Sequence, residues 1–78
     1  MPLTPELSQE LSILSLFNPS TLQEGIKVHE HSATHEDVAA TKRLFEKGLI
    51  TQQDGGYLTA LGRDALEHLQ DLILILSS

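Results

Sequence analysis

The residues best suited to chemistry are three histidines that lie close together in the sequence. His29, His31 and His35 form a His-x-His-x3-His pattern, and Glu30 adds a carboxylate beside them. Imidazole and carboxylate groups can bind zinc or nickel. Three side chains spread over a turn between two helices need not converge, however. The pattern therefore predicts a polar, exposed turn first and a metal site only as the weaker alternative, and no cofactor is expected.

Three basic residues form the second group that could do chemistry. Lys42, Arg43 and Lys47 follow one another at a spacing typical of one side of a helix. Such cations can bind the phosphates and bases of DNA, or they can form the solvated side of an amphipathic helix and pair with Glu46 and other acids. The sequence leaves both interpretations open.

Catalytic motifs are missing from the chain. It contains no Gly-x-Ser-x-Gly elbow, no phosphate-binding glycine loop and no His-Glu-x-x-His helix. The absence of cysteine excludes disulfides, thiolate zinc sites and cysteine nucleophiles. A domain of 78 residues is also too small to enclose an ordinary substrate pocket. We therefore expect a protein that is not an enzyme.

The elements that must position these residues are mainly helical, with one small hairpin. Threonines at 4, 34 and 59 precede helix-forming segments and are expected to be N-caps, while Gly48 is expected to end the helix before it in a left-handed conformation. Apolar residues recur at helical spacing within each segment. The expected elements are helices over about 5–17, 20–30, 34–47 and 60–76 and a hairpin over 49–59.

The second of these helices has the least support. Ser20 and Gln23 resemble a capping box, and Leu22 and Ile26 give a narrow apolar stripe. Gly25 in the middle weakens the helical propensity but would allow another backbone to approach closely. The segment is nevertheless predicted to be a short helix.

The second half of the chain resembles a known family. The segments RLFEKGLI (43–50), DGGYLT (54–59) and LGR (61–63) are similar to the wing region of MarR-like and PadR-like winged-helix regulators. In that order a glycine ends a helix, two apolar residues start a strand, Asp-Gly turns the hairpin and threonine caps the next helix. The whole chain also resembles an uncharacterised family of short bacterial proteins associated with a DNA-binding fold. The resemblance implies one winged helix-turn-helix domain over 1–78, with four helices and a hairpin between the third and fourth.

The resemblance also implies which residues would contact DNA. His35, Ala39, Lys42 and Arg43 would face the major groove, and Lys47 would lie near the phosphates. Two departures count against strong binding. The wing tip at 52–56 contains no lysine or arginine, and residues 32–48 hold three acids against three bases. Because phosphate neutralisation supplies much of the affinity for DNA, binding by one copy would be weak and sensitive to salt.

Composition limits the partners and the compartment. The chain has 11 acidic and 5 basic residues and a net charge of −6, so it repels a polyanion unless its few cations gather on one face. It has no basic segment followed by an apolar run at the N-terminus and no apolar stretch that could span a bilayer. We expect a cytoplasmic protein that does not bind a membrane.

The last predicted helix has more apolar surface than a small core can bury. The run Leu72–Leu76 is apolar on every side of the helix, so part of it should contact another surface. A homodimer is favoured, because small cores usually need added burial. The alternative is a monomer in which the helix over 5–17 covers the run. The predicted dimer contacts are Leu66, Leu69, Leu72, Ile73 and Leu76.

Two main functions follow from these patterns, and a metal-responsive regulator that uses the histidines is a weaker third. The first is a DNA-binding or transcription-associated regulator that acts as a homodimer, with the helix at 34–47 in the major groove. The second is an acidic adaptor that binds protein and does not bind DNA. The fold favours the first function and the charge favours the second.

Overall fold

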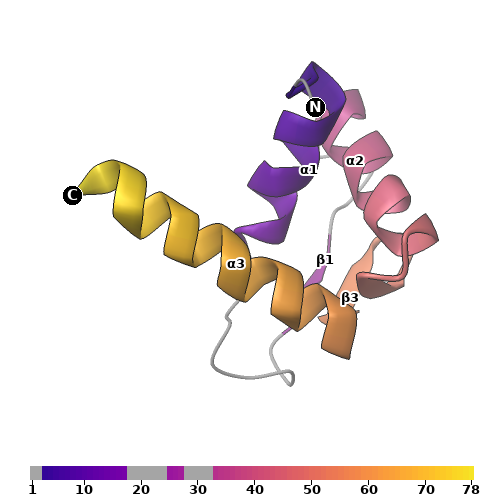
Figure 1. The fold of residues 1–78 in the computed structure, drawn as a ribbon. Coiled ribbons are helices and arrows are strands. Elements are labelled where there is room, and N and C mark those ends of the chain that lie inside the picture. Colours follow the sequence, from indigo (N-terminus) through magenta and orange to yellow (C-terminus); the bar gives the residue numbers. More distant parts are fainter. Residues whose placement is uncertain (1–2, 18–24, 28–32) are drawn as a thin grey trace.

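The computed structural model describes residues 3–17, 25–27 and 33–78. Within these ranges the chain forms three helices and three short strands, and Figure 1 shows their arrangement. In chain order they are α1 (Pro5–Leu14), β1 (Ile26–Lys27), α2 (His35–Glu46), β2 (Ile50–Gln52), β3 (Gly55–Leu58) and α3 (Ala60–Ser77).

A threonine starts each of the three helices, as the sequence predicts. Thr4, Thr34 and Thr59 have extended backbones, and the hydroxyl of each accepts a hydrogen bond from the amide three residues further on, at 3.0–3.1 Å. Each cap satisfies one of the amides that a helix N-terminus leaves without a partner.

Gly48 ends α2 in a left-handed conformation, with a φ of 81°. The amides of Gly48 and Leu49 donate back to the carbonyls of Phe45 and Leu44, both at 3.0 Å. This paired arrangement turns the chain sharply out of the helix and directs Leu49 and Ile50 into the hairpin.

The three strands form an antiparallel sheet in the order β1-β3-β2. In the central strand, Gly56 lies opposite Ile26 and Leu58 lies opposite Ile50. A Cβ on Gly55 would stand 2.4 Å from the Ile26 carbonyl oxygen, so only glycine lets β1 approach so closely. Glycines that the sequence assigns to the hairpin turn therefore form part of a strand, and only Gln53 and Asp54 separate β2 from β3.

The helix predicted over 20–30 is wrong, and with it the winged helix-turn-helix with four helices. Ile26–Lys27 is a strand, and α2 is the next helix after α1 among the described residues; 18–24 and 28–32 lie outside them. A Cβ on Gly25 would lie 2.5 Å from the Gly56 carbonyl oxygen, so the glycine serves the close approach to β3. A glycine inside a short helix costs about 1 kcal/mol, whereas the strand gains ladder hydrogen bonds. The described order is α1-β1-α2-β2-β3-α3.

The first helix is also shorter than predicted. It ends at Leu14, and the amides of Leu16 and Phe17 then donate to the carbonyls three residues back, at 3.0 and 3.2 Å. This tight turn places Phe17 in the core, where it is buried. The last turn of a helix is often tightened in this way, so periodicity alone does not locate its end.

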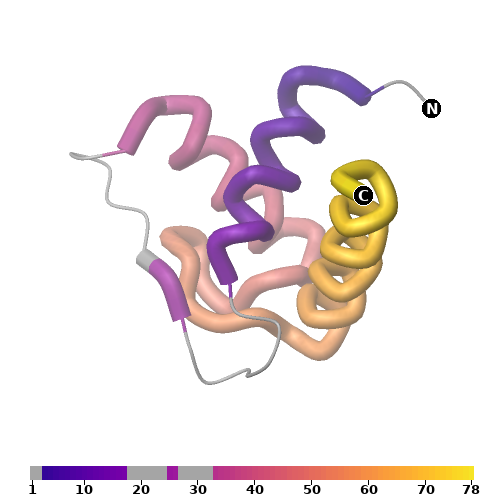
Figure 2. Tube along the Cα trace, turned by 90° about the vertical axis from the view of Figure 1, so that its left-hand side faces the viewer, coloured from indigo at the N-terminus to yellow at the C-terminus, as the bar shows by residue number. Residues whose placement is uncertain are grey.

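The core lies where all three helices meet the hairpin. Figures 1 and 2 show α1 beside α2, with the strands at one end of both and α3 crossing below α1. Leu66 of α3 is fully buried in this core, among side chains from the other helices and the hairpin. The buried apolar residues are Ile13, Leu14, Phe17, Ala40, Leu44, Ile50, Leu58 and Leu66.

Candidate functional site

The residues that the sequence assigns to DNA contact all lie on α2 or at its C-terminus. His35, Lys42 and Lys47 belong to the accessible side of the helix, with Ala39 and Arg43 between them. Their spacing of three or four residues places them on neighbouring turns of the outer side of the helix. The structure therefore brings the predicted residues onto one surface, but it does not leave all of their charges available.

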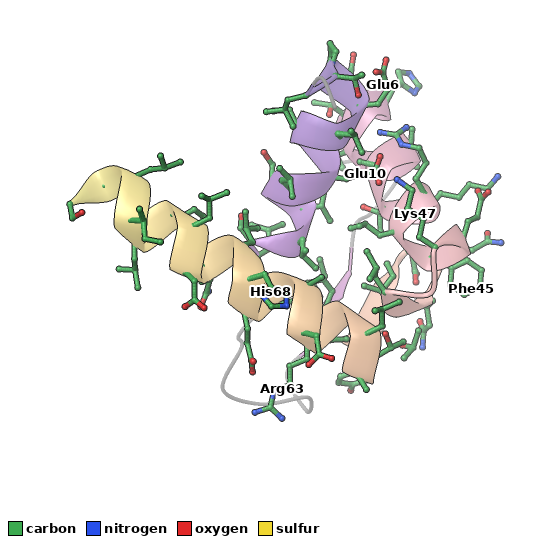
Figure 3. The ribbon with its side chains drawn as sticks, in the orientation of Figure 1. Glu6, Glu10, Phe45, Lys47, Arg63 and His68 are labelled. Atoms are coloured by element: carbon green, nitrogen blue, oxygen red, sulfur yellow. The ribbon has the colours of Figure 1, made fainter. Side chains whose placement is uncertain are left out.

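Arg43 and Lys47 are held by a carboxylate on another helix. Glu10 of α1 has a side chain that is 6% exposed, and its Oε2 accepts a hydrogen bond from Arg43 Nε at 2.9 Å. Its Oε1 pairs with Lys47 Nζ. Arg43 also donates through Nη2 to the backbone carbonyl of Glu6 at 3.2 Å. Figure 3 shows Glu10 and Lys47 facing each other between α1 and α2.

The ionisation of Glu10 reflects these two cations. Burial raises the pKa of the Glu10 carboxyl, but hydrogen bonds from Lys47 and Arg43 and their positive charges outweigh it. The net pKa is therefore below its ordinary value, and Glu10 is ionised at neutral pH. The three groups together carry a charge of +1 rather than the +2 that the two cations would offer alone.

An open hollow of about 360 Å³ lies between the first half of α1 and one side of α2. Three of the predicted DNA-contact residues, His35, Ala39 and Arg43, line it, but so do the acids Glu6 and Glu36. A surface of mixed charge does not attract a phosphate strongly. Among the described residues, Lys42 is the cation of α2 that makes no hydrogen bond or ion pair.

Sequence reasoning missed Glu10, although its position contained a usable signal. Glu10 stands three residues after Leu7 and four before Leu14, on the apolar side of α1. A carboxylate in that position must be paired, because an isolated buried charge is too costly. Arg43 and Lys47 at a spacing of four are a matching pair of cations.

The predicted histidine cluster lies only partly within the described residues. His29 and His31 are outside them, and His35 is exposed at the first position of α2. The part of the chain that the structure describes contains no group of three histidine, aspartate or glutamate side chains placed to hold a metal ion.

The predicted dimer residues of α3 divide into two groups. Leu66 is a core residue rather than a surface contact, since it is fully buried, and Leu69 packs partly against the core. Leu72, Ile73 and Leu76 are exposed, as are Leu74 and Ile75 between them. We call Leu72–Leu76 the apolar end of α3; these five side chains are 45–75% exposed. Figure 1 shows this end projecting past α1.

A second apolar surface lies between α1, the C-terminal end of α2 and Ala65 of α3. It is an open groove of about 260 Å³, and we call it the leucine groove. The groove is bordered by Leu44 and by the ion pair of Glu10 and Lys47. The other lining residues are Leu3, Leu7, Leu11, Leu14, Leu49 and Ala65.

Within the described ranges, no helix combines the length and the apolar character needed to cross a lipid bilayer.

Comparison with known proteins gives a family without a function. No curated protein and no solved structure matches the chain. The model of a family of unknown function, DUF5669, matches residues 1–77. Because that match covers nearly the whole length, the chain belongs to the DUF5669 family.

Proposed function

We propose that this chain is a non-enzymatic, acidic protein-interaction module that associates through the apolar end of α3 and does not bind duplex DNA. The observation that carries the proposal is the exposure of Leu72–Leu76, five consecutive aliphatic side chains outside the core. This is the second of the two main functions that the sequence leaves open.

The energetic argument rests on the number of exposed side chains. Full burial of one leucine or isoleucine stabilises a protein by about 1.5–3 kcal/mol. Because these five residues remain 45–75% exposed, burial that would stabilise each chain by about 5–9 kcal/mol is not realised within the domain. That is comparable to the whole stability of a small domain, about 5–15 kcal/mol. Contact with another protein surface recovers part of it.

The charge distribution argues against DNA as the partner. A protein binds duplex DNA largely by neutralising phosphates with several lysines and arginines. Here Glu10 already pairs with Arg43 and Lys47, and Arg63 pairs with Glu67 on α3 at 3.2 Å. With a net charge of −6, the chain has too few available cations to hold a phosphate backbone.

Association through α3 can be tested by sedimentation velocity over a range of concentrations. We expect the wild-type chain to have an apparent mass above the 8.6 kDa of the monomer, and the Leu74→Glu variant to have the monomer mass. Leu61→Glu is the matched control, because Leu61 is also exposed but lies in the first turn of α3. A wild-type chain that stays monomeric at every soluble concentration would overturn the proposal.

The exclusion of DNA needs its own measurement. In fluorescence anisotropy with a labelled duplex at about 50 mM salt, where electrostatic binding is strong, we expect no saturable binding. Binding that weakens with added salt and in Lys42→Ala would show that the first function is correct instead.

A further inference from the structure

We infer that the apolar end of α3 inserts into the leucine groove of a second copy of this chain, so that two copies exchange their α3 ends. This inference rests on the proposed function and adds the surface that receives the helix. Both surfaces are on the same chain, and both are apolar and accessible.

The groove is suited to receive aliphatic side chains. Leu3 and Leu11 at its border are exposed, so the groove is not filled by the described part of its own chain. An inserted leucine or isoleucine would remove apolar surface from water on both sides of the contact. Backbone amides and carbonyls within α1 already bond within the helix, and the charged side chains at the groove, Glu10 and Lys47, are paired with each other.

The end of α3 cannot reach the groove of its own chain. Ala65 lines the groove, and Leu72 stands seven residues further along the same helix. At 1.5 Å per residue, a continuous helix carries Leu72 about 10 Å beyond Ala65. Figures 1 and 2 show α3 without a kink that would turn this end back toward α1. An apolar end of α3 that enters the groove must therefore belong to another molecule.

The charges at the two surfaces allow a second copy to bind, although both chains are acidic overall. Asp71 is the last charged residue, and residues 72–78 carry no ionisable side chain. The groove contains one carboxylate and one ammonium group, Glu10 and Lys47, which are paired. Two chains of charge −6 can thus meet through nearly neutral surfaces and keep their other acids apart. A basic protein would find no matching charge at this site.

Symmetry makes the contact reciprocal. Each copy has one apolar end and one groove, so a two-fold axis allows both contacts to form at once. The buried apolar surface is then twice that of a single insertion. When both contacts form about one two-fold axis, the assembly closes as a dimer rather than growing into a filament.

Because the chain contains no cysteine, a single introduced cysteine can be labelled specifically. A nitroxide spin label is attached to Ser78→Cys in an unlabelled chain, which is mixed with ¹⁵N-labelled wild-type chain. We expect the label to broaden the amide signals of Leu7 and Leu11 in the wild-type partner. The control is a label on Gln53→Cys, at the exposed hairpin turn, which should leave those two amides unchanged.

A second measurement separates this inference from the proposed function. Leu11→Glu in the groove should lower the association constant at least about tenfold, because it places a charge in an apolar contact. Leu16→Glu, at an exposed position that does not line the groove, should leave it unchanged. Two results together would overturn insertion into the groove: a dimer in which the label broadens only signals of α3, and an association constant that Leu11→Glu does not lower. Association through α3 would then still stand. A monomeric wild type overturns both. Should Leu11→Glu fail to fold, the spin-label result in the wild-type groove decides alone.

Discussion

Glu10 is a buried carboxylate that two cations hold in place. Removing a carboxylate from water is costly, and here both of its oxygens are compensated by partners on α2. Arg43 and Lys47 remain partly exposed, so they keep part of their hydration in the exchange. Glu10 thus fixes α1 against α2, and it converts residues that a sequence pattern assigns to DNA into a contact between helices.

The lowered pKa of Glu10 makes the stability of the protein dependent on pH. We expect Glu10→Gln to lower the free energy of unfolding at pH 7 by about 1–2 kcal/mol, since charge-assisted hydrogen bonds become neutral ones. The difference should shrink in acid. A depressed native pKa contributes stability that is fully present above the unfolded value, about 4.3, and is lost as pH falls through the native pKa. Urea unfolding of the wild type and of Glu10→Gln between pH 7 and pH 3 measures this difference in the free energy of unfolding.

Glu46→Gln is the matched control for this experiment, because Glu46 is an exposed acid on α2. It should change the stability by no more than about 0.5 kcal/mol at any pH. If Glu10→Gln were as stable as the wild type at pH 7, the ion pair would not stabilise the contact between α1 and α2.

At the scale of elements, local chemistry was predictable and long-range pairing was not. The caps at Thr4, Thr34 and Thr59 and the left-handed Gly48 depend on residues within one turn, which a sequence shows directly. Strand β1 has only two residues, and it exists because β3 lies beside it. Gly25 is a local signal against a helix, but the pairing with β3 that makes this segment a strand is not visible in the sequence, and for that reason the helix prediction over 20–30 is wrong.

Gly62 in the first turn of α3 shows how close two elements approach. Its neighbour in space is the backbone of Leu49, whose carbonyl oxygen would lie 1.9 Å from an added Cβ. Alanine normally stabilises a helix by about 1 kcal/mol relative to glycine. Here we expect Gly62→Ala to destabilise the protein by about 1–3 kcal/mol, because α3 must move away from the hairpin. Thermal or urea unfolding shows whether the substitution raises or lowers the free energy of unfolding.

The substitution Leu61→Ala provides the comparison, since Leu61 is the exposed neighbour of Gly62 in the same turn. This substitution should change the free energy of unfolding by no more than about 0.5 kcal/mol. A Gly62→Ala variant that is more stable than the wild type would show that the close approach of α3 to Leu49 does not restrict this position.

At the scale of the whole molecule, charge and apolar surface are separated. Acidic side chains give the chain a net charge of −6, while the apolar end of α3 carries no charge. The sequence indicated this excess apolar surface because a run of five aliphatic residues cannot all face one core. It could not show that Leu66 is buried and Leu72–Leu76 are exposed, because periodicity does not distinguish a core from an interface.

This separation predicts how salt affects association. We expect sedimentation equilibrium to give a larger association constant at about 300 mM than at about 20 mM sodium chloride, because salt screens the repulsion between two acidic chains. Burial of apolar surface is not weakened by screening. Asp71→Asn, which removes the charge nearest the apolar end, should strengthen association at low salt and have less effect at high salt. Association that weakens steadily as salt is added would instead require a contact between opposite charges, and the uncharged end of α3 could not then be its centre.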